Sequence, residues 1–345
     1  LVNAAGESFD TIHVINVNSR IAGGGSSALI TMQDGVSLEF EPNSTWTTDS
    51  LMALSSCAGP VFLGSYRDGL DTATFVKGGY DTLNISDFII QNLVADTSGG
   101  KEYNAANSYG IGNTNGWTFS AGPAGKTYYW SGLSSKNWSD VGNWEQNALP
   151  AVCIPGPMDT VIFDQAHLTL ATYDTVVVDK SSFVRVMDWS EVTTSAPALM
   201  LDADLQIYDD VILDDSLSFM YAEGFNAYEE NVPVFILSPA YAQADFMPLT
   251  KRYDMNRFVA GLSTTDTLFM TDSLVMDSVT TFGFISGVFE SGQNSIYTGI
   301  LMSGQSSDKT VHLEKTYMEV KYQVDFQDNS VLTLHLDSSM IMMLG

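Results

Sequence analysis

The segment LDADLQIYDDVILDDSLSFMY (201–221) decides the fold class of this chain. Three short apolar runs, LQIY, VIL and LSFMY, are separated by acidic breaks of two or three residues. Adjacent aspartates repel each other and prefer water, so we expect each break to lie at a surface corner. Two-residue antiparallel hairpins favour Asn-Gly or other glycine-containing turns, which these breaks lack. The pattern therefore predicts a β-solenoid, in which coils of short strands with polar corners stack on one another.

Strand patterns continue through the rest of the chain, each bounded by turn residues. No segment carries apolar residues at helical spacing over three turns, so we expect helix to be a minor component. We predict an all-β chain of β-solenoid (parallel β-helix-like) units in tandem. A β-sandwich is the alternative, because sequence alone does not distinguish parallel from antiparallel pairing. The clearest strand runs are ALITMQ (28–33), VSLEFE (36–41), PVFLGSY (60–66), LNISDFIIQNLV (83–94), DTVIFD (159–164), DTVVVD (174–179) and VPVFIL (232–237).

A composition shift marks one domain boundary. The segment 96–126 is rich in Gly, Asn and Ser, which is typical of a closing loop followed by a linker. We predict that residues 1–119 are the C-terminal part of one β-repeat unit, 120–127 a linker, and 128–345 the N-terminal part of the next. The first residue is Leu1 and the last lies in an apolar run, so we expect a longer polypeptide.

The charge balance excludes some classes of partner. The chain has 41 Asp and Glu against 14 Lys and Arg, with a formal net charge of −27. Nucleic acid and anionic membranes both require clustered Lys and Arg, so we expect neither as a partner. No apolar run reaches the roughly 18 residues that membrane insertion needs. The excess of carboxylates suits an extracellular protein and can attract divalent cations.

The stretch YYWSGLSSKNWSDVGNWEQNALPAVCIPGPMDTVIFD (128–164) carries a spaced aromatic and polar motif. It resembles the opening of repeat units in very large Bacteroidota cell-surface proteins of the adhesin or gliding-motility type. The preceding NAANSYGIGNTNGWTF (104–119) is similar to the closure of such a unit. The matching positions of the opening motif are Tyr128, Tyr129, Trp130, Gly132, Asn137, Trp138, Ser139, Asp140, Asn143, Trp144, Pro155, Asp159, Val161, Phe163 and Asp164.

The resemblance implies a function and a location. It implies export by the type IX secretion system and display at the cell surface, attached to the outer membrane. The expected role is a structural or adhesive module that binds surfaces, glycans or partner proteins without catalysis. Expected partners are other repeat units of the same chain, the secretion machinery, and surface glycans or other surface proteins.

Trp130, Trp138 and Trp144 allow two interpretations. Large apolar rings can cap the first rung of a solenoid, whose end is otherwise open. Three tryptophans in a Gly/Asn/Ser context can also form an exposed platform on which sugars stack. We favour the cap, because the same motif has to begin a unit.

The sequence also contains ten Asp-(Ser/Thr)-apolar tripeptides. The tripeptide is similar to the acceptor motif for general O-glycosylation in Bacteroidota. Solenoid geometry also favours an Asp at a corner, then a hydroxyl residue, then an apolar strand start. Both interpretations stay open, and the candidate O-glycosylation sites are Thr11, Ser50, Thr72, Thr82, Thr160, Thr175, Ser216, Thr267, Ser273 and Ser278.

Metal and disulfide sites have weaker support. No EF-hand loop or Gly-Gly-x-Gly-x-Asp repeat is present, so calcium is the only cofactor we consider, at converging acidic corners. Solvated corners are the simpler interpretation of these aspartates. Cys57 and Cys153 can form a disulfide in an oxidising compartment, or can be two small buried residues. The candidate calcium ligands are Asp202, Asp204, Asp209, Asp210, Asp214 and Asp215.

Catalysis has little support. The four histidines, His13, His167, His312 and His335, sit in strand-like runs without metal-ligand spacing. No nucleophile elbow, phosphate loop or dinucleotide fingerprint is present. The enzyme alternative is a β-helical carbohydrate-active enzyme, either a polysaccharide lyase or a glycosidase. A lyase requires basic residues that this chain largely lacks, whereas a glycosidase requires only two carboxylates.

Overall fold

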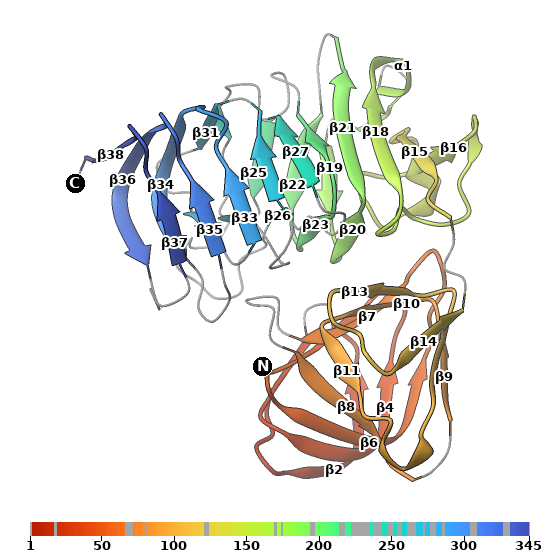
Figure 1. Ribbon diagram of the computed structural model, residues 1–345. Coiled ribbons are helices and arrows are strands. Elements are labelled where there is room, and N and C mark those ends of the chain that lie inside the picture. The colour runs from red at the N-terminus through yellow and green to blue at the C-terminus, as the bar shows by residue number, and fades with distance from the viewer. Residues whose placement is uncertain are drawn as a thin grey trace. The chain divides into compact units, whose positions relative to one another are not determined.

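The structure, a computed structural model, forms two compact units, Leu1–Ala124 and Gly125–Gly345 (Figure 1). The division falls inside the segment predicted as the linker. From residue 218 to 260 the structure describes only short backbone stretches. The described residues are 2–16, 19–65, 72–79, 82–120, 124–168, 171–173, 175–193, 197–213, 218–221, 235–237, 243–247, 252–253, 257–260, 267–271, 273–276, 281–284, 287–303, 309–326 and 332–344.

The described residues of unit 1 form three parallel sheets and a short 3-10 turn, Ser98–Gly100. The six-stranded sheet contains β1 (Val2–Asn3), β3 (Ser19–Ala22), β5 (Ser37–Phe40), β7 (Val61–Ser65), β10 (Phe88–Gln91) and β13 (Tyr109–Ile111). The five-stranded sheet contains β2 (Ser8–Val14), β4 (Gly25–Met32), β6 (Thr45–Ala53), β8 (Ala73–Lys77) and β11 (Leu93–Ala95). The three-stranded sheet contains β9 (Leu83–Ser86), β12 (Tyr103–Ala106) and β14 (Trp117–Ser120).

The described strands of unit 2 also form three sheets, of eleven, three and ten strands. The eleven-stranded sheet contains β15 (Thr127–Trp130), β16 (Trp144–Gln146), β17 (Leu149–Pro150), β18 (Thr160–Asp164), β21 (Val186–Glu191), β24 (Val211–Ile212), β27 (Gln243–Met247), β30 (Thr267–Met270), β33 (Gly287–Glu290), β35 (Lys309–His312) and β37 (Leu332–His335). The three-stranded sheet contains β19 (Thr175–Val178), β22 (Ala198–Leu201) and β25 (Ser218–Tyr221). The ten-stranded sheet contains β20 (Ser182–Val184), β23 (Leu205–Ile207), β26 (Phe235–Leu237), β28 (Arg252–Tyr253), β29 (Arg257–Ala260), β31 (Leu274–Met276), β32 (Thr281–Phe284), β34 (Ile296–Ser303), β36 (Tyr317–Phe326) and β38 (Met340–Met343). The helical elements among the described residues of unit 2 are a 3-10 turn at Val141–Asn143 and the single turn α1 (Gln165–Leu168).

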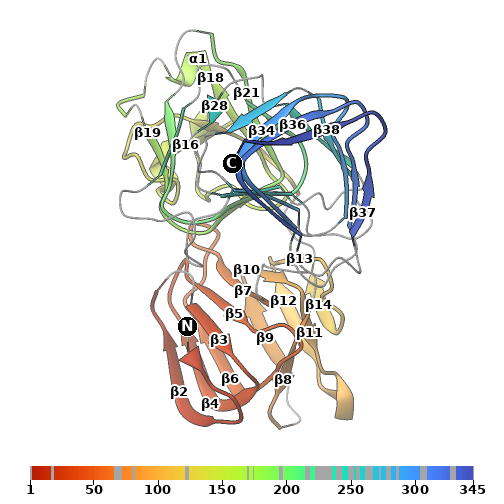
Figure 2. The same cartoon turned by 90° about the vertical axis from the view of Figure 1, so that its left-hand side faces the viewer.

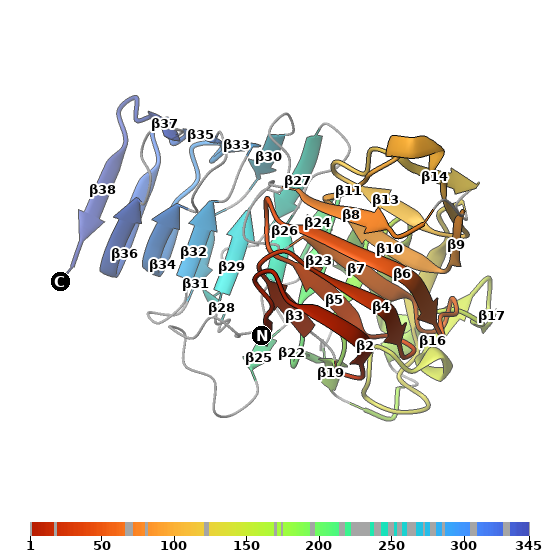
Figure 3. The ribbon, with the colours of Figure 1, turned by 90° about the horizontal axis from the view of Figure 1, so that it is seen from below.

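Consecutive strands visit different sheets, and each strand pairs with the strand one coil further along the chain. Val178 of β19, for example, lies opposite Leu201 of β22, which lies opposite Tyr221 of β25. Among the described strands, all ladders are parallel except the hairpin formed by β15, β16 and β17. The predicted β-solenoid is therefore confirmed, and the parallel pairing excludes the β-sandwich alternative. Figure 2 looks along the stack of unit 2, and Figure 3 shows its strands side by side.

Polar corners separate the strands, as the acidic breaks indicated. Asp209 and Asp210 form a partly exposed bend between β23 and β24. The second break, 214–216, lies outside the described residues. The predicted run 83–94 is not one strand but three, β9, β10 and β11, because Asp87 and Asn92 take positive φ angles of 60° and 48°. Asp and Asn tolerate this left-handed backbone better than other residues with a side chain, so they turn the chain there.

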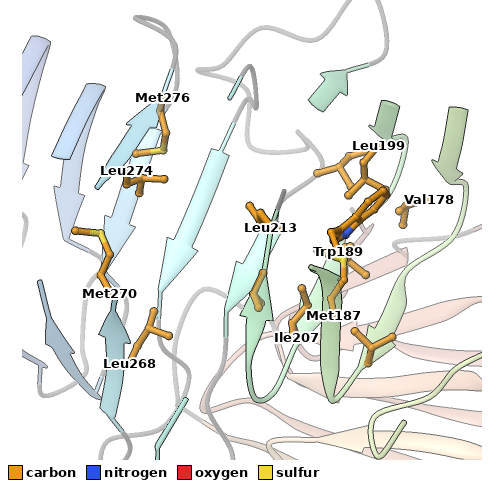
Figure 4. Packing of buried hydrophobic residues seen from close by; sticks show 14 of the residues in the cluster. Val178, Met187, Trp189, Leu199, Ile207, Leu213, Leu268, Met270, Leu274 and Met276 are labelled. Atoms are coloured by element: carbon orange, nitrogen blue, oxygen red, sulfur yellow. The ribbon is translucent and has the colours of Figure 1, made fainter. Parts of the chain in front are cut away.

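Each unit encloses its own apolar core. In unit 2 the inward residues of β19, β22 and β23 are almost all aliphatic, and they meet residues of the other sheets in the centre of the coil (Figure 4). Trp189 and Met187 project from β21 into this core, beside Leu199 of β22 (Figure 4). Alternation along the strands explains the pattern, since successive side chains of a strand point to opposite faces of the sheet.

Candidate functional site: the tryptophan cap of unit 2

The motif that opens unit 2 forms a buried aromatic cluster, which we call the tryptophan cap (Trp130, Trp138, Trp144 and Phe163). The three indoles are all 0% exposed. Trp144 lies at the centre, with ring centroids 4.9 Å from Trp130 and 4.8 Å from Trp138, both edge-to-face. Phe163 of β18 continues the cluster and stacks on Trp189 at 3.6 Å. Edge-to-face and stacked rings bury large apolar area in favourable geometry, so this cluster stabilises the first coil.

Asn143 holds the loop between the tryptophans in place. Its Oδ1 accepts hydrogen bonds from the backbone N–H groups of Ser134 (3.0 Å) and Ser135 (2.8 Å). Its Nδ2 donates to the Asn137 carbonyl (2.8 Å) and to Ser135 Oγ (3.0 Å). The side chain is 0% exposed, so these four hydrogen bonds replace the hydrogen bonds to water that the amide loses on burial.

The half-buried Asp140 also holds this loop in place by hydrogen bonds. Its carboxylate accepts hydrogen bonds from Ser134 Oγ (2.9 Å), Ser135 Oγ (2.7 Å) and the Gly142 N–H (2.9 Å). Partial burial raises the pKa of Asp140, but the three hydrogen bonds outweigh it and leave the pKa below its usual value. Ser139 makes a parallel contact, donating its N–H (3.0 Å) and its hydroxyl (2.6 Å) to Asp179. The polar side chains of the Asn-Trp-Ser-Asp…Asn-Trp motif described above, Ser139, Asp140 and Asn143, thus all form hydrogen bonds within unit 2.

The cap also covers strand edges. The backbone at Lys136 and Trp138 pairs with Val177 of β19, with N–O distances of 2.7 Å in both directions. Trp144 Nε1 donates to the Trp138 carbonyl at 2.8 Å, and β16 pairs antiparallel with β15. The first coil strands of two sheets, β15 and β19, are therefore paired at this end. Without these contacts they would present unpaired backbone N–H and C=O groups.

The burial of the three tryptophan rings bears on the choice between a cap and a sugar-stacking platform. Stacking of a sugar requires an exposed ring face, and none of the three indoles has one. The Nε1 atoms of Trp130 and Trp138 are buried without a hydrogen-bond partner, whereas that of Trp144 has one. Their burial favours the role of a cap that starts the stack.

The motif that closes unit 1 is built in a similar way. Trp117 of β14 is 8% exposed, and its Nε1 donates to the Leu93 carbonyl at 2.9 Å. Its ring lies against Tyr103 (5.3 Å) and Phe75 (6.0 Å). Gly116 has a φ angle of +87°, and a Cβ there would lie 2.2 Å from the Ala95 carbonyl oxygen. Only glycine fits that position, which explains the Gly-Trp pair of the motif.

The candidate O-glycosylation sites fall into two groups. Thr11 and Ser50 lie within β2 and β6, whereas the others that are described open a strand or directly precede one. Thr11 and Thr82 are exposed, and the remaining described hydroxyl residues are half-buried. Those half-buried residues are Ser50, Thr72, Thr160, Thr175, Thr267 and Ser273, while Ser216 and Ser278 lie outside the described residues. Strand starts fit the corner interpretation, and the two exposed threonines are the most accessible acceptors.

The candidate calcium ligands do not form a cluster where they are described. Asp209 accepts hydrogen bonds from Nε and Nη2 of Arg185, both at 2.8 Å. Desolvation raises the pKa of Asp202; the Asp179 carboxylate adds to this rise, and Lys136 opposes it. Within the described ranges, no three Asp, Glu, His or Cys side chains are arranged to hold a metal ion, and Asp214 and Asp215 lie outside those ranges.

The two cysteines lie in loops. Cys57 is exposed in the turn between β6 and β7, and Cys153 is half-buried between β17 and β18. Neither is a small buried residue of a core. The pairing of Cys57 with Cys153 stays a prediction.

One polar cluster, around His167, is not predicted by the sequence patterns. The sequence predicts His167 in a strand-like run, but the residue lies in α1, because the Asp164 carboxylate accepts the His167 backbone N–H at 2.7 Å and ends β18. The same carboxylate contacts His167 Nδ1 at 2.7 Å, and Nε2 faces Glu145 at 3.6 Å. The imidazole stacks on Tyr129 at 4.8 Å. The spacing Asp-x-x-His was a usable signal for a helix start, since an Asp can cap the first turn.

Comparisons with protein-family models, with curated proteins and with solved structures find no match for this chain. Among the described residues, no helix is both long enough and apolar enough to cross a membrane.

Proposed function

We propose that this chain is a structural and adhesive module of a large secreted cell-surface protein. The observation that supports this role most is the tryptophan cap, whose rings are buried. The polar side chains of the adjoining loop, Asn143 and Asp140, form hydrogen bonds within that loop. The most distinctive residues of the chain thus build the start of a stack of coils. The outward faces of the sheets are then the surface on which glycans, other surface proteins or solid surfaces would bind.

The location is part of the same proposal. Export through the type IX secretion system and attachment at the outer membrane follow from the resemblance of residues 104–164 to Bacteroidota repeat units. The net charge of −27 suits a protein outside the cell. The exposed Thr11 and Thr82 are the hydroxyl residues at which we expect O-glycans first.

An adhesion assay with a parallel activity assay tests this function. The chain is coupled to beads, and retention under flow is measured on glass, on mucin and on immobilised acidic and neutral polysaccharides. Albumin-coated beads and beads carrying heat-unfolded chain are the controls. We expect folded chain to be retained on at least one surface, with no release of reducing ends or unsaturated uronates.

A second candidate function, a β-helical carbohydrate-active enzyme, rests on the His167 cluster. An imidazole held by the Asp164 carboxylate and facing Glu145 has the parts of an acid–base group. Sustained product release that is lost in His167→Asn and in Glu145→Gln would establish this function in place of adhesion. Product release that both variants retain would place catalysis elsewhere and would equally contradict the proposal. Retention equal to that of albumin on every surface would remove the adhesive role.

A further inference from the structure

A column of three ligand-type side chains lies on the outer face of the eleven-stranded sheet. Glu290 of β33 lies opposite His312 of β35, and His312 lies opposite His335 of β37. Neighbouring strands of a sheet are about 4.8 Å apart, so the three residues occupy consecutive rungs of one line. Val311, which precedes His312, points into the core, so the column faces outward.

The side chains of this column are close together and open to solvent. The rings of His312 and His335 are stacked, with centroids 4.3 Å apart and planes 3° from parallel. Nε2 of His312 lies 3.8 Å from Oε1 of Glu290. The His312 side chain is 24% exposed and that of Glu290 is 32% exposed, and His335 is exposed as well. An ion from solution can therefore reach all three.

We propose that Glu290, His312 and His335 bind one divalent transition-metal ion of the zinc type. Two imidazole nitrogens and a carboxylate oxygen are a ligand set that Zn²⁺ accepts, with bonds of about 2.0–2.2 Å. Two such ligands on one tetrahedral ion lie about 3.3 Å apart. Nε2 of His312 and Oε1 of Glu290 are 3.8 Å apart, within about 1 Å of that separation. As the described side chains stand, they do not converge on one point. Rotation of the exposed His335 ring and of the Glu290 carboxylate toward His312 brings them together.

The types of ligand predict a metal selectivity that net negative charge alone would not give. The net charge of −27 attracts any cation, but carboxylates alone favour Ca²⁺ and Mg²⁺. Imidazole nitrogens favour Zn²⁺, Cu²⁺ and Ni²⁺ instead. An ion at this position would link β33, β35 and β37, three successive strands of the sheet, and would stabilise the folded unit by binding it in preference to the unfolded chain.

Calorimetric titration of the full chain with ZnCl₂ tests the proposal. The protein carries no histidine tag and is first dialysed against a chelator. We expect one Zn²⁺ per chain, not displaced by excess Ca²⁺. His335→Ala and His312→Ala should each lower the affinity at least about tenfold, the loss of one good ligand interaction. His13→Ala is the matched control, because it removes an outward imidazole that hydrogen-bonds to Thr31 in unit 1.

A second measurement separates metal binding from loss of fold. Zn²⁺ should raise the melting temperature of the unaltered chain and of His13→Ala, but not that of His335→Ala. If His335→Ala loses its β-sheet circular dichroism, His335→Gln takes its place, since it keeps the size of the side chain. Binding that Ca²⁺ displaces, or that both column histidine variants retain, overturns the proposal. If only His167→Ala loses Zn²⁺ binding, the proposal is also overturned, because the ion is then bound by the His167 cluster at α1.

Discussion

Asp159 shows how one residue of an Asp-Thr-apolar tripeptide can be structural. The residue is 5% exposed, and its carboxylate accepts hydrogen bonds from the backbone N–H groups of Gly156 (2.7 Å) and Lys126 (2.8 Å). Burial raises the pKa of Asp159, and the two hydrogen bonds oppose that shift without cancelling it. The aspartate of this tripeptide therefore joins β15 to the loop before β18. The adjacent Thr160 is half-buried and opens β18.

Exchange of Asp159 for Asn should destabilise unit 2. Asn has one acceptor oxygen where the carboxylate has two, so one backbone N–H is left buried without a partner. Such a group costs about 1–3 kcal/mol. We expect that decrease in the free energy of unfolding of Asp159→Asn, measured by urea denaturation. Thr160→Ala, the control at the proposed sugar acceptor, should stay within about 0.5 kcal/mol. Equal stabilities of the two variants would contradict the structural role of Asp159.

At the scale of elements, the tryptophan cap determines how the first coil of unit 2 is held. Trp138 lies in the loop between β15 and β16 and contacts both the aromatic cluster and the edge of β19. Its removal takes away a fully buried ring and leaves a cavity that the surrounding hydrogen-bonded loop cannot fill easily.

Trp138→Ala should therefore lower the stability of unit 2 by about 3–5 kcal/mol. Hydrogen exchange followed by mass spectrometry should show faster exchange in β15, β18 and β19, with β4 and β6 of unit 1 unchanged. Leu133→Ala is the control, because Leu133 lies in the same loop and is 51% exposed. If exchange in β19 is the same in both variants, the cap does not protect that edge.

Local sequence patterns predict the strands and corners better than they predict which residues of neighbouring coils lie opposite each other. Alternating apolar residues and acidic breaks predicted short strands with corners, which the structure contains. The division of 83–94 depended on positive φ at Asp87 and Asn92, which strand propensity does not report. The stack of His312 on His335 depends on the register of β35 and β37, since the two residues are one coil apart. Register between coils is set by packing of the whole core, and no short motif encodes it.

At the scale of the whole molecule, the two units have separate cores, since no described residue belongs to both apolar clusters. Each unit encloses its own apolar cluster with its own set of sheets. The boundary between Ala124 and Gly125 lies between the last strand of one unit and the first strand of the next.

Residues 1–124 and 125–345, produced separately, should each fold. Buried apolar area drives folding, and each fragment keeps the area of its own core. We expect each to give a cooperative calorimetric transition and the circular dichroism of β-sheet. Reductant is kept in the buffer, because each fragment has one cysteine. A fragment that melts without a cooperative transition would show that its core is incomplete alone.

The antiparallel hairpin at the start of unit 2 also affects which insertions and deletions the gene can tolerate. In a stack of coils, each strand takes its alignment from the one before it, so an insertion in one coil can shift the alignment of those that follow. The hairpin and the tryptophan cap begin a new alignment at β15, using contacts made within residues 127–189. Changes of coil length or number before that point therefore need no compensating change after it. The part of a gene that encodes unit 2 therefore carries the starting alignment of its own coils.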